Sequence, residues 1–298
     1  NEFFKIFDKN IQNNKKIIIN KTKVLKIEKN FNFYKIYCQD NIISSKKVIV
    51  AAGSDSINIC SNLKSKIIPT YYGVGTAFVT KPKNKEFNIL PKNTVLRSPN
   101  RGSTCGIHVV PRNDNTYYIG AGSFISKSKI NSFGRIETIN YLHRSLENEL
   151  VGKTPYLEFI PVIGYRPISF DCKPLIGMLN NHPNIYVIGG TKRDGLTYAP
   201  IISDSIINWL ENKSNYPLFE GWEPEREPIS YGDRDYAIKS YVDNKIAGIL
   251  EHNKFKKNKK KEIIKNLNYE AQIFHNKIIK TFKLNKDFGV HPEILNIF

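Results

Sequence analysis

The 298-residue sequence predicts an α/β fold that also carries an antiparallel-sheet region and a helical C-terminal extension. Two apolar strand-like runs, residues 47–52 and 185–188, each stop at glycine, which is typical of strands that feed a turn or a helix. Between them lie several shorter strand-like runs. Past Trp209 the pattern changes to a proline-containing arm and then to helical spacing.

The N-terminal part of the chain is predicted to form three strands. Residues 23–28 and 33–38 are rich in β-branched and aromatic side chains. Residues 47–52 lack polar alternation, so we expect this strand to be covered on both faces. It ends at Gly53, where the backbone can approach a ligand closely.

The middle of the chain predicts mainly strands. Apolar residues at helical spacing predict one amphipathic helix at 136–150. A second helix is expected from Ala199 or Pro200 to Leu210, because proline is common at the first helical position. The strand-like runs are 67–79, 94–97, 106–110, 117–119 and 156–162.

The last part of the chain predicts an extended arm at 216–231 and helices at about 235–252 and 260–283. The second of these helices carries an apolar stripe that we expect to pack against the main body rather than to bind a partner. The stripe consists of Ile264, Leu267, Ala271, Phe274 and Ile278.

The net charge of +18 raises nucleic acid or a membrane surface as a partner. Lys, Asn and Ile are abundant throughout, so we attribute most of this charge to the codon bias of an AT-rich genome. The densest basic run, within residues 254–261, is interpreted as a solvated linker beside a helix.

Metal binding and membrane insertion are not expected. The four cysteines are far apart and form no Cys-x-x-Cys pair, so no metal site is predicted and the thiols are expected to be reduced in the cytoplasm. No apolar run approaches the roughly 20 residues that a bilayer span needs.

The most informative stretch is 161–211. It contains Gly164-Tyr165-Arg166-Pro167, then Asp171 and Pro174-Leu175-Ile176-Gly177, then a strand that stops at Gly189-Gly190 and the run Arg193-Asp194-Gly195-Leu196-Thr197-Tyr198-Ala199-Pro200. In order and spacing this stretch resembles the closing segment of the D-amino-acid-oxidase-like flavoenzymes, the class of glycine oxidase and sarcosine oxidase. Residues 47–53, 109–112 and 118–121 resemble further strands of that family. The resemblance spans roughly 15–211.

The resemblance implies an FAD/NAD(P)-binding (Rossmann-like) domain with an inserted α+β substrate domain built on an antiparallel sheet. Residues 1–65 would be part of the FAD-binding domain, 66–160 the substrate domain, 161–211 the closing segment of the FAD-binding domain, and 212–298 a mostly helical C-terminal extension.

The family's Gly-x-Gly-x-x-Gly turn cannot be present, because no glycine precedes Gly53. We therefore expect the FAD-binding domain to be N-terminally incomplete by about 100–150 residues. A second subunit is the other expected source of this turn.

A strand that ends in Gly-Gly and feeds a helix directs free N–H groups toward a ligand. Gly195, Leu196 and Thr197 would supply these donors, and the helix dipole would stabilise the negative charge of reduced flavin. An ordinary strand–turn–helix crossover is the alternative. The resemblance adds further FAD-binding candidates, namely Val24, Ala52, Gly53, Gly190, Arg193 and Asp194.

Three side chains are the substrate-binding candidates. The resemblance implies that Arg166 binds the substrate carboxylate, for which a guanidinium offers two parallel hydrogen bonds. The alternative for Arg166 is a buried ion pair with Asp171 or another acid. Arg193 is the second candidate and His108 the third, with a hydrogen-bonded strand histidine as the alternative for His108.

The function implied by the resemblance is FAD-dependent oxidation of the C–N bond of a small-molecule amine or amino acid. Hydride would pass from the α-carbon to flavin N5, and the resulting imine would hydrolyse. No side chain is assigned as an acid or base, and the electron acceptor, O₂ or another, stays open. Two alternatives are a flavoenzyme that acts on an amine of modified tRNA and a non-catalytic basic binding subunit that keeps the fold.

Overall fold

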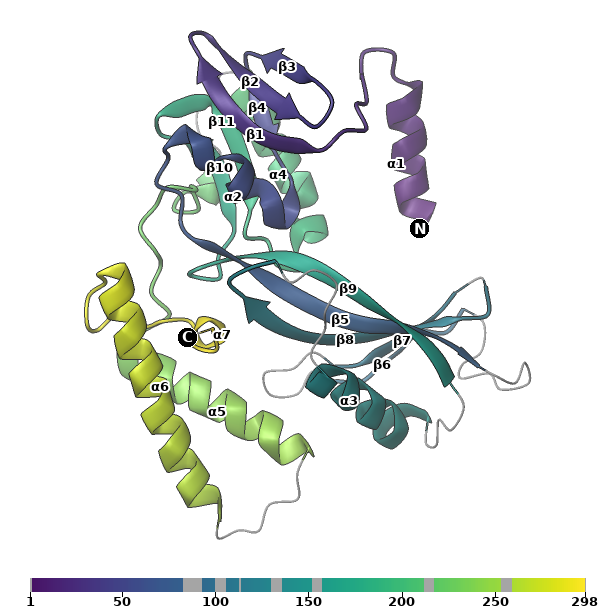
Figure 1. Ribbon diagram of the computed structural model, residues 1–298, viewed down its shortest axis with the longest axis vertical. Coiled ribbons are helices and arrows are strands. Elements are labelled where there is room, and N and C mark those ends of the chain that lie inside the picture. The colour runs from purple at the N-terminus through teal and green to yellow at the C-terminus, as the bar shows by residue number, and fades with distance from the viewer. Residues whose placement is uncertain are drawn as a thin grey trace. The chain divides into compact units, whose positions relative to one another are not determined.

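The computed structural model describes residues 2–82, 93–99, 106–112, 114–129, 136–151, 157–211, 217–252 and 259–297 (Figure 1). The chain divides into two compact units, one made of Asn1–Val48 and Asn58–Ser65 and the other of Ile49–Ile57 and Lys66–Phe298. Helices and antiparallel sheets occur together, so the predicted mixed α/β class is confirmed.

The first unit contains a helix and a three-stranded antiparallel sheet of order β1-β2-β3. Ile27 and Tyr34 are buried in this unit, as the alternation of strand side chains requires. The predicted strands at 23–28 and 33–38 are present, whereas the helix and the third strand were not predicted. These elements are α1 (Glu2–Asn13), β1 (Val24–Asn30), β2 (Phe33–Cys38) and β3 (Ile42–Ser45).

A small sheet has the order β10-β11-β4 and belongs to the second unit except for Val48, the first residue of β4. Its strands are β4 (Val48–Val50), β10 (Leu175–Leu179) and β11 (His182–Gly189). The central strand β11 contains the predicted run 185–188, and three successive side chains of it are buried. The prediction that the strand at 47–52 is covered on both faces is wrong, because Ile49 is 42% exposed while Val50 is 4% exposed. As a short strand at the sheet edge, β4 buries only one of these two faces.

The large sheet of the second unit has the order β6-β7-β8-β5-β9 and is antiparallel throughout. Its strands are β5 (Thr70–Pro82), β6 (Leu96–Arg97), β7 (His108–Pro111), β8 (Tyr117–Ser126) and β9 (Leu157–Ser169). β9 is longer than the predicted run 156–162 and includes the motif Gly164-Tyr165-Arg166-Pro167. Pro167 is tolerated there because β9 is an edge strand, where a missing N–H donor costs little.

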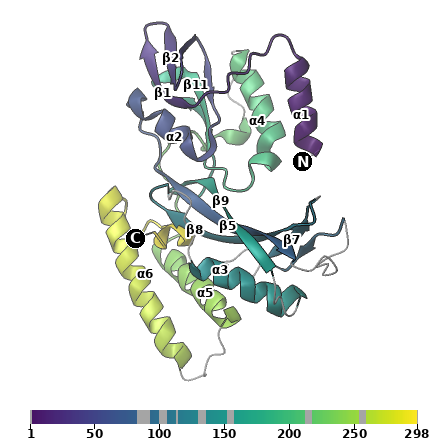
Figure 2. The ribbon, with the colours of Figure 1, turned by 45° about the vertical axis from the view of Figure 1, so that its right-hand side comes forward.

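One face of this sheet is covered by α3 (Ile136–Ser145), which continues as a π-helical turn at Leu146–Val151 (Figures 1 and 2). Leu142 and Leu146 are fully buried against Val109 and Ile119. The helix expected at 136–150 is therefore present. Its first apolar residue, Ile136, is 69% exposed and does not join the buried stripe.

The C-terminal extension forms the helices expected there, α5 (Arg234–His252) and α6 (Lys260–Phe282), preceded by the short turn η4 (Pro217–Phe219) and followed by α7 (Pro292–Leu295). The stripe of α6 packs into a core that includes Phe170, Ile168 and Tyr241. The prediction that this stripe packs against the main body is confirmed.

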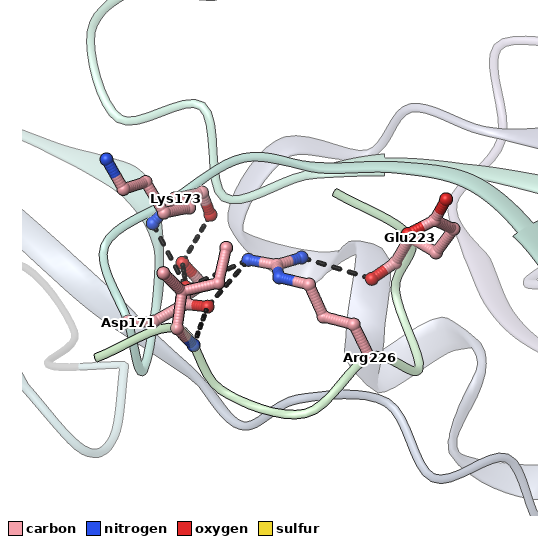
Figure 3. Close-up of polar contacts among 6 residues, drawn as sticks. Asp171, Lys173, Glu223 and Arg226 are labelled. Carbon is pink, nitrogen blue, oxygen red and sulfur yellow. Dashed lines mark hydrogen bonds and ion pairs between the residues drawn. The ribbon is translucent and has the colours of Figure 1, made fainter. Parts of the chain in front are cut away.

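Asp171 and Arg226 anchor the arm of the extension to the turn that follows β9 (Figure 3). Both side chains are buried, with exposures of 0% and 7%. Nη2 of Arg226 donates to both carboxylate oxygens of Asp171 at 2.9 and 2.8 Å. The same carboxylate accepts from the Ser169 hydroxyl and from the backbone N–H groups of Lys173 and Ile229. A buried charge that is fully hydrogen-bonded in this way is costly to disturb.

In the described part of the chain, no helix is long and apolar enough to cross a membrane. Cys38, Cys60 and Cys172 are free thiols there, and Cys105 lies outside the described residues. Most of the basic run within 254–261 also lies outside them, with Lys259 and the first residues of α6 as the described part.

Candidate functional site

β11 leads through Gly190 into α4 (Gly195–Leu210), the strand–turn–helix element predicted from the sequence. Gly190 has a φ of +63°, and a Cβ there would lie 2.8 Å from the backbone oxygen of Lys173. Only glycine fits this turn without strain. The predicted helix start at Ala199 or Pro200 is wrong, because the helix begins at Gly195 and contains Pro200.

The first turn of α4 offers unoccupied backbone donors. Asp194 is the N-cap residue but makes no side-chain capping bond, and the first turn contains no acidic residue. The N–H groups of Gly195, Leu196 and Thr197 have no acceptor within the helix by its geometry. With the positive end of the helix dipole, these donors suit the electron-rich pyrimidine end of a flavin.

The loop after β4 lies beside the end of β11. The hydroxyl of Ser56 donates to the backbone oxygen of Ile188 at 3.1 Å, and the short helix η1 (Gly53–Asp55) contacts β11. Gly53 has a φ of +59°, and a Cβ there would have no neighbour within 4 Å. Val24 belongs to the first unit, so its role at the adenine stays a prediction.

Arg166 lies on β9 opposite Gly73 of β5. Its guanidinium extends over Gly75, where an added Cβ would lie 3.0 Å from Nη2 and 3.1 Å from Cζ. Gly164 is the register partner of Gly75, and a Cβ added at Gly164 would have no neighbouring atom within 4 Å. The glycine at 75 thus leaves the space that the Arg166 side chain occupies.

The alternative partner proposed for Arg166 is already engaged. Asp171 binds Arg226, as described above, so Asp171 does not neutralise Arg166. Within the ranges that the structure describes, no acidic side chain lies at ion-pair distance from Arg166. The half-buried guanidinium therefore keeps its bidentate donors available for an anionic ligand.

His108 lies on β7 opposite Gly120, and its ring stacks on Tyr118 with 5.9 Å between ring centroids. Burial lowers the pKa of His108, and the positive charges of Arg97 and Arg166 lower it further, although a hydrogen bond with the backbone of Gly106 acts in the opposite direction. The imidazole is therefore neutral at pH 7, and it lies close enough to Arg166 for that positive charge to lower its pKa.

A cavity of about 330 Å³ joins two of the three substrate-binding candidates. Arg166 and Arg193 both line it, whereas His108 does not. One side, the sheet wall, consists of Gly73, Ser123, Phe124, Ile125, Arg166, Ile168, Lys192 and Arg193. The opposite side, the helix wall, consists of residues from α5 and α7 and of the residue that follows α7, namely Tyr241, Asn244, Lys245, Pro292, Glu293 and Asn296.

The sequence assigned no role to the residues of the helix wall. They have no motif of their own, and they follow Arg166 by more than 70 positions. Gly73 and Gly75 were also missed, although two glycines at i and i+2 of one strand are a usable signal. Alternate strand residues share a face, so such a pair indicates a bare patch that another group can approach.

Lys192 links the two walls through an ion pair, with 3.1 Å between its Nζ and Oε1 of Glu293. Burial acts to lower the pKa of Lys192, but Cys172 and Glu293 outweigh it and the pKa is raised. Burial also raises the pKa of the Cys172 thiol to about 12. Lys192 is thus charged and Cys172 is a neutral thiol at pH 7.

His291 caps α7, because its Nδ1 accepts the backbone N–H of Glu293 at 3.2 Å. Burial lowers the pKa of His291 to about 4, and the positive charge of Lys192 acts in the same direction. The cap therefore consists of a neutral imidazole near pH 7.

Comparisons with known proteins match the chain to one family and to several solved structures. The family described as "FAD dependent oxidoreductase" (DAO) matches residues 9–209. Glycine oxidase from Geobacillus kaustophilus is similar in structure, with a TM-score of 0.54, 18% identity, and coverage of 69% of this chain and 52% of that chain. L-proline dehydrogenase from P. horikoshii has a TM-score of 0.53 and 17% identity, and the match covers 70% of this chain and 54% of that chain.

L-alpha-glycerophosphate oxidase from Mycoplasma pneumoniae, in a dithionite-reduced structure with FAD bound, gives a TM-score of 0.51 at 18% identity, covering 72% of this chain and 56% of that chain. Similarity at this level of identity shows the fold. The chain spans about half the length of these solved structures.

Proposed function

The chain belongs to the DAO family of FAD-dependent oxidoreductases, and on that premise we propose that it serves the oxidation of a carbon–nitrogen bond in an amine or amino acid. The observation that carries the choice of substrate is the guanidinium of Arg166. It is half-buried, it lines the 330 Å³ cavity, and Asp171, the alternative partner, is bound to Arg226. Such a group is suited to a substrate carboxylate.

FAD, when bound, supplies the acceptor for the electron pair that leaves the substrate. The candidates to hold it in this chain are the Ala52-Gly53 loop, Gly190 and the first turn of α4. The N–H groups of Gly195, Leu196 and Thr197 would stabilise negative charge at its pyrimidine end. Val24, Arg193 and Asp194 are the remaining candidates for cofactor contacts.

Arg166 would fix the substrate by two parallel hydrogen bonds to its carboxylate, which orients the α-carbon as well as adding affinity. The oxidised product would be an imine, which water hydrolyses to a carbonyl compound and an amine or ammonia. No side chain is assigned to remove a proton. A neutral His108 would offer the substrate a polar contact rather than a charge.

The fold alone does not choose between substrates, because the similar structures include a glycerophosphate oxidase beside two enzymes named for amino acids. The carboxylate specificity of a guanidinium fork favours the amino acid. In the described part of the chain, no specific observation favours a tRNA-linked amine as substrate or a non-catalytic binding role.

The proposal is tested with the full-length protein. We expect flavin absorbance in the purified protein, stabilisation against heat by added FAD, and loss of the visible absorbance when amino acids are added under anaerobic conditions. Absence of flavin and of any FAD-induced stabilisation would contradict a flavoenzyme. Flavin that is reduced by dithionite but by no amine or amino acid would contradict C–N oxidation.

A further inference from the structure

The helix wall places an amide group in the cavity that Arg166 lines. Asn244 lies three residues after Tyr241 on α5, which packs against α7 (Figure 1), so the two side chains share one face of the helix. Both line the cavity of about 330 Å³, and Asn244 is half-buried. The family match ends at residue 209, so this amide belongs to a part of the chain that the family does not account for.

Other polar side chains of the helix wall are engaged within the protein. The hydroxyl of Tyr241 donates to Oε1 of Glu270 at 3.1 Å, and Nδ2 of Asn296 donates at 3.1 Å to the backbone oxygen four residues earlier. Glu293 is held in the ion pair described above. Within the ranges that the structure describes, the amide of Asn244 makes no hydrogen bond. Its donor and acceptor are therefore both available to a ligand.

The position of Asn244 within α5 is unfavourable for the helix itself. Asparagine is a poor residue for a helix interior, because its amide competes with the backbone for hydrogen bonds. Asn268 on α6 shows the usual local solution, since its Nδ2 donates to the backbone oxygen of Ile264 at 2.9 Å. Asn244 lacks such a bond. A residue that breaks a local preference without a compensating contact is typical of a functional position.

We propose that Asn244 binds an uncharged amide of the substrate, so that the cavity takes an amino acid whose side chain ends in a carboxamide. This inference rests on the proposed function and names its substrate class. A primary amide carries N–H donors beside a carbonyl acceptor, so two amides can exchange two N–H···O bonds. The substrate carboxylate binds Arg166, the side-chain amide binds Asn244, and the apolar lining at Ile125 and Ile168 accommodates the methylene groups between them.

The test compares two ligands of equal charge and similar shape that carry no amine to oxidise. Glutaramate ends in a carboxamide, and 5-methylhexanoate has an isopropyl group in its place. Their dissociation constants are measured by calorimetry on the full-length protein at one fixed ionic strength. We expect glutaramate to bind about tenfold more tightly, and we expect Asn244→Leu, which has a similar volume but no amide, to lose this preference. Asn244→Ala, which favours the helix, should lose it as well.

Asn268→Leu is the matched control, because Asn268 is a half-buried helical asparagine that does not line the cavity. It should keep the preference for glutaramate, and thermal unfolding identifies the variants that are folded. A wild-type protein without the preference, or one that binds neither ligand, overturns the proposal. So does a preference that survives in a folded Asn244→Leu or Asn244→Ala protein, or one that is lost equally in Asn268→Leu.

Failure of this proposal is distinguishable from failure of the proposed function. If amino acids reduce the bound flavin but glutaramate is not preferred, C–N oxidation stands and the role of Asn244 is wrong. If glutaramate is preferred in an Asn244-dependent manner and no amine or amino acid reduces the flavin, the amide site stands and the reaction is wrong.

Discussion

The two walls of the cavity differ in origin and in how they are held. The sheet wall lies within the family match and is shaped by the backbone, through Gly73, Gly75 and the register of β5 with β9. The helix wall lies outside that match and is held by side chains, through the Asp171–Arg226 pair and the Lys192–Glu293 pair. The difference teaches that backbone register and small residues shape the sheet wall, whereas the helix wall depends on ion pairs between residues far apart in the sequence.

The largest expected effect comes from breaking the anchor of the helix wall. Asp171→Asn keeps the shape but leaves Arg226 buried without a negative partner, and we expect a loss of about 3–5 kcal/mol in the free energy of unfolding. Urea denaturation measures it. The matched control is Asp243→Asn in the exposed Lys239–Asp243 pair, which should change stability by less than about 0.5 kcal/mol.

If both variants lose the same small amount, the buried pair does not anchor the extension. A double variant, Asp171→Leu with Arg226→Met, sharpens the test. It removes both charges together, so it should be more stable than Asp171→Asn alone.

The second effect is a pH dependence of the helix wall. The pKa of His291 in the folded protein, about 4, is below its ordinary value of 6.5, so below pH 6.5 the unfolded state binds the proton more readily. Stability should therefore be complete above pH 6.5 and fall as the pH drops toward 4, by up to about 1.4 kcal/mol per pH unit. Protonation also removes the lone pair that accepts the N–H of Glu293.

Urea denaturation at several pH values measures this loss. His291→Asn keeps a capping acceptor that does not titrate, so its stability should decrease less between pH 6.5 and 4.5 than that of the wild type. Other acids and histidines titrate in both proteins, and the difference between the two curves isolates His291. Parallel curves would show that His291 does not carry this dependence.

The third effect is on the sheet wall. Arg166→Lys keeps the charge but loses the two parallel donors, and it should raise the KM for an amino acid at least tenfold, about 1.4 kcal/mol. Steady-state kinetics with the FAD-loaded protein measures it. Arg112→Lys, at an exposed pair with Asp114, should leave the KM unchanged. An unchanged KM in a folded Arg166→Lys protein would contradict the carboxylate role.

The smallest effect tests whether glycine makes room for Arg166. Gly75→Ala places a Cβ about 3 Å from the guanidinium, so the flexible side chain must shift, and we expect the KM to rise about fivefold, or about 1 kcal/mol, with little loss of stability. Gly164→Ala changes the register partner of Gly75, where the Cβ meets nothing, and should leave the KM unchanged. Equal KM values in the two variants would contradict the space-making role.

Much of the fold follows from the sequence because its elements have strong local patterns. The strands around Ile27, the turn at Gly190 and the stripe of α6 at Ala271 were predicted from side-chain periodicity and glycine placement. The start of α4 was not, because Pro200 suggested a first helical position that the chain does not use. The burial of β4 on only one face was not predicted, because apolar composition does not reveal that a strand lies at a sheet edge.

The site was half predictable for a physical reason. Arg166, Arg193 and the first turn of α4 belong to one short stretch whose order resembles a known family, so local sequence carries them. The helix wall depends on long-range contacts, such as Arg226 with Asp171 and Lys192 with Glu293, which no local pattern encodes. Tyr241 and Lys245 lie on a helix whose spacing predicts packing but not what the packed face meets.

The most direct test of the account is a crystal structure of the protein with pentanoate bound. We predict one pentanoate in the cavity between the two walls, with its carboxylate at hydrogen-bond distance from the Arg166 guanidinium. Pentanoate bound outside this cavity, or with its carboxylate away from Arg166, would contradict the carboxylate-binding role of Arg166.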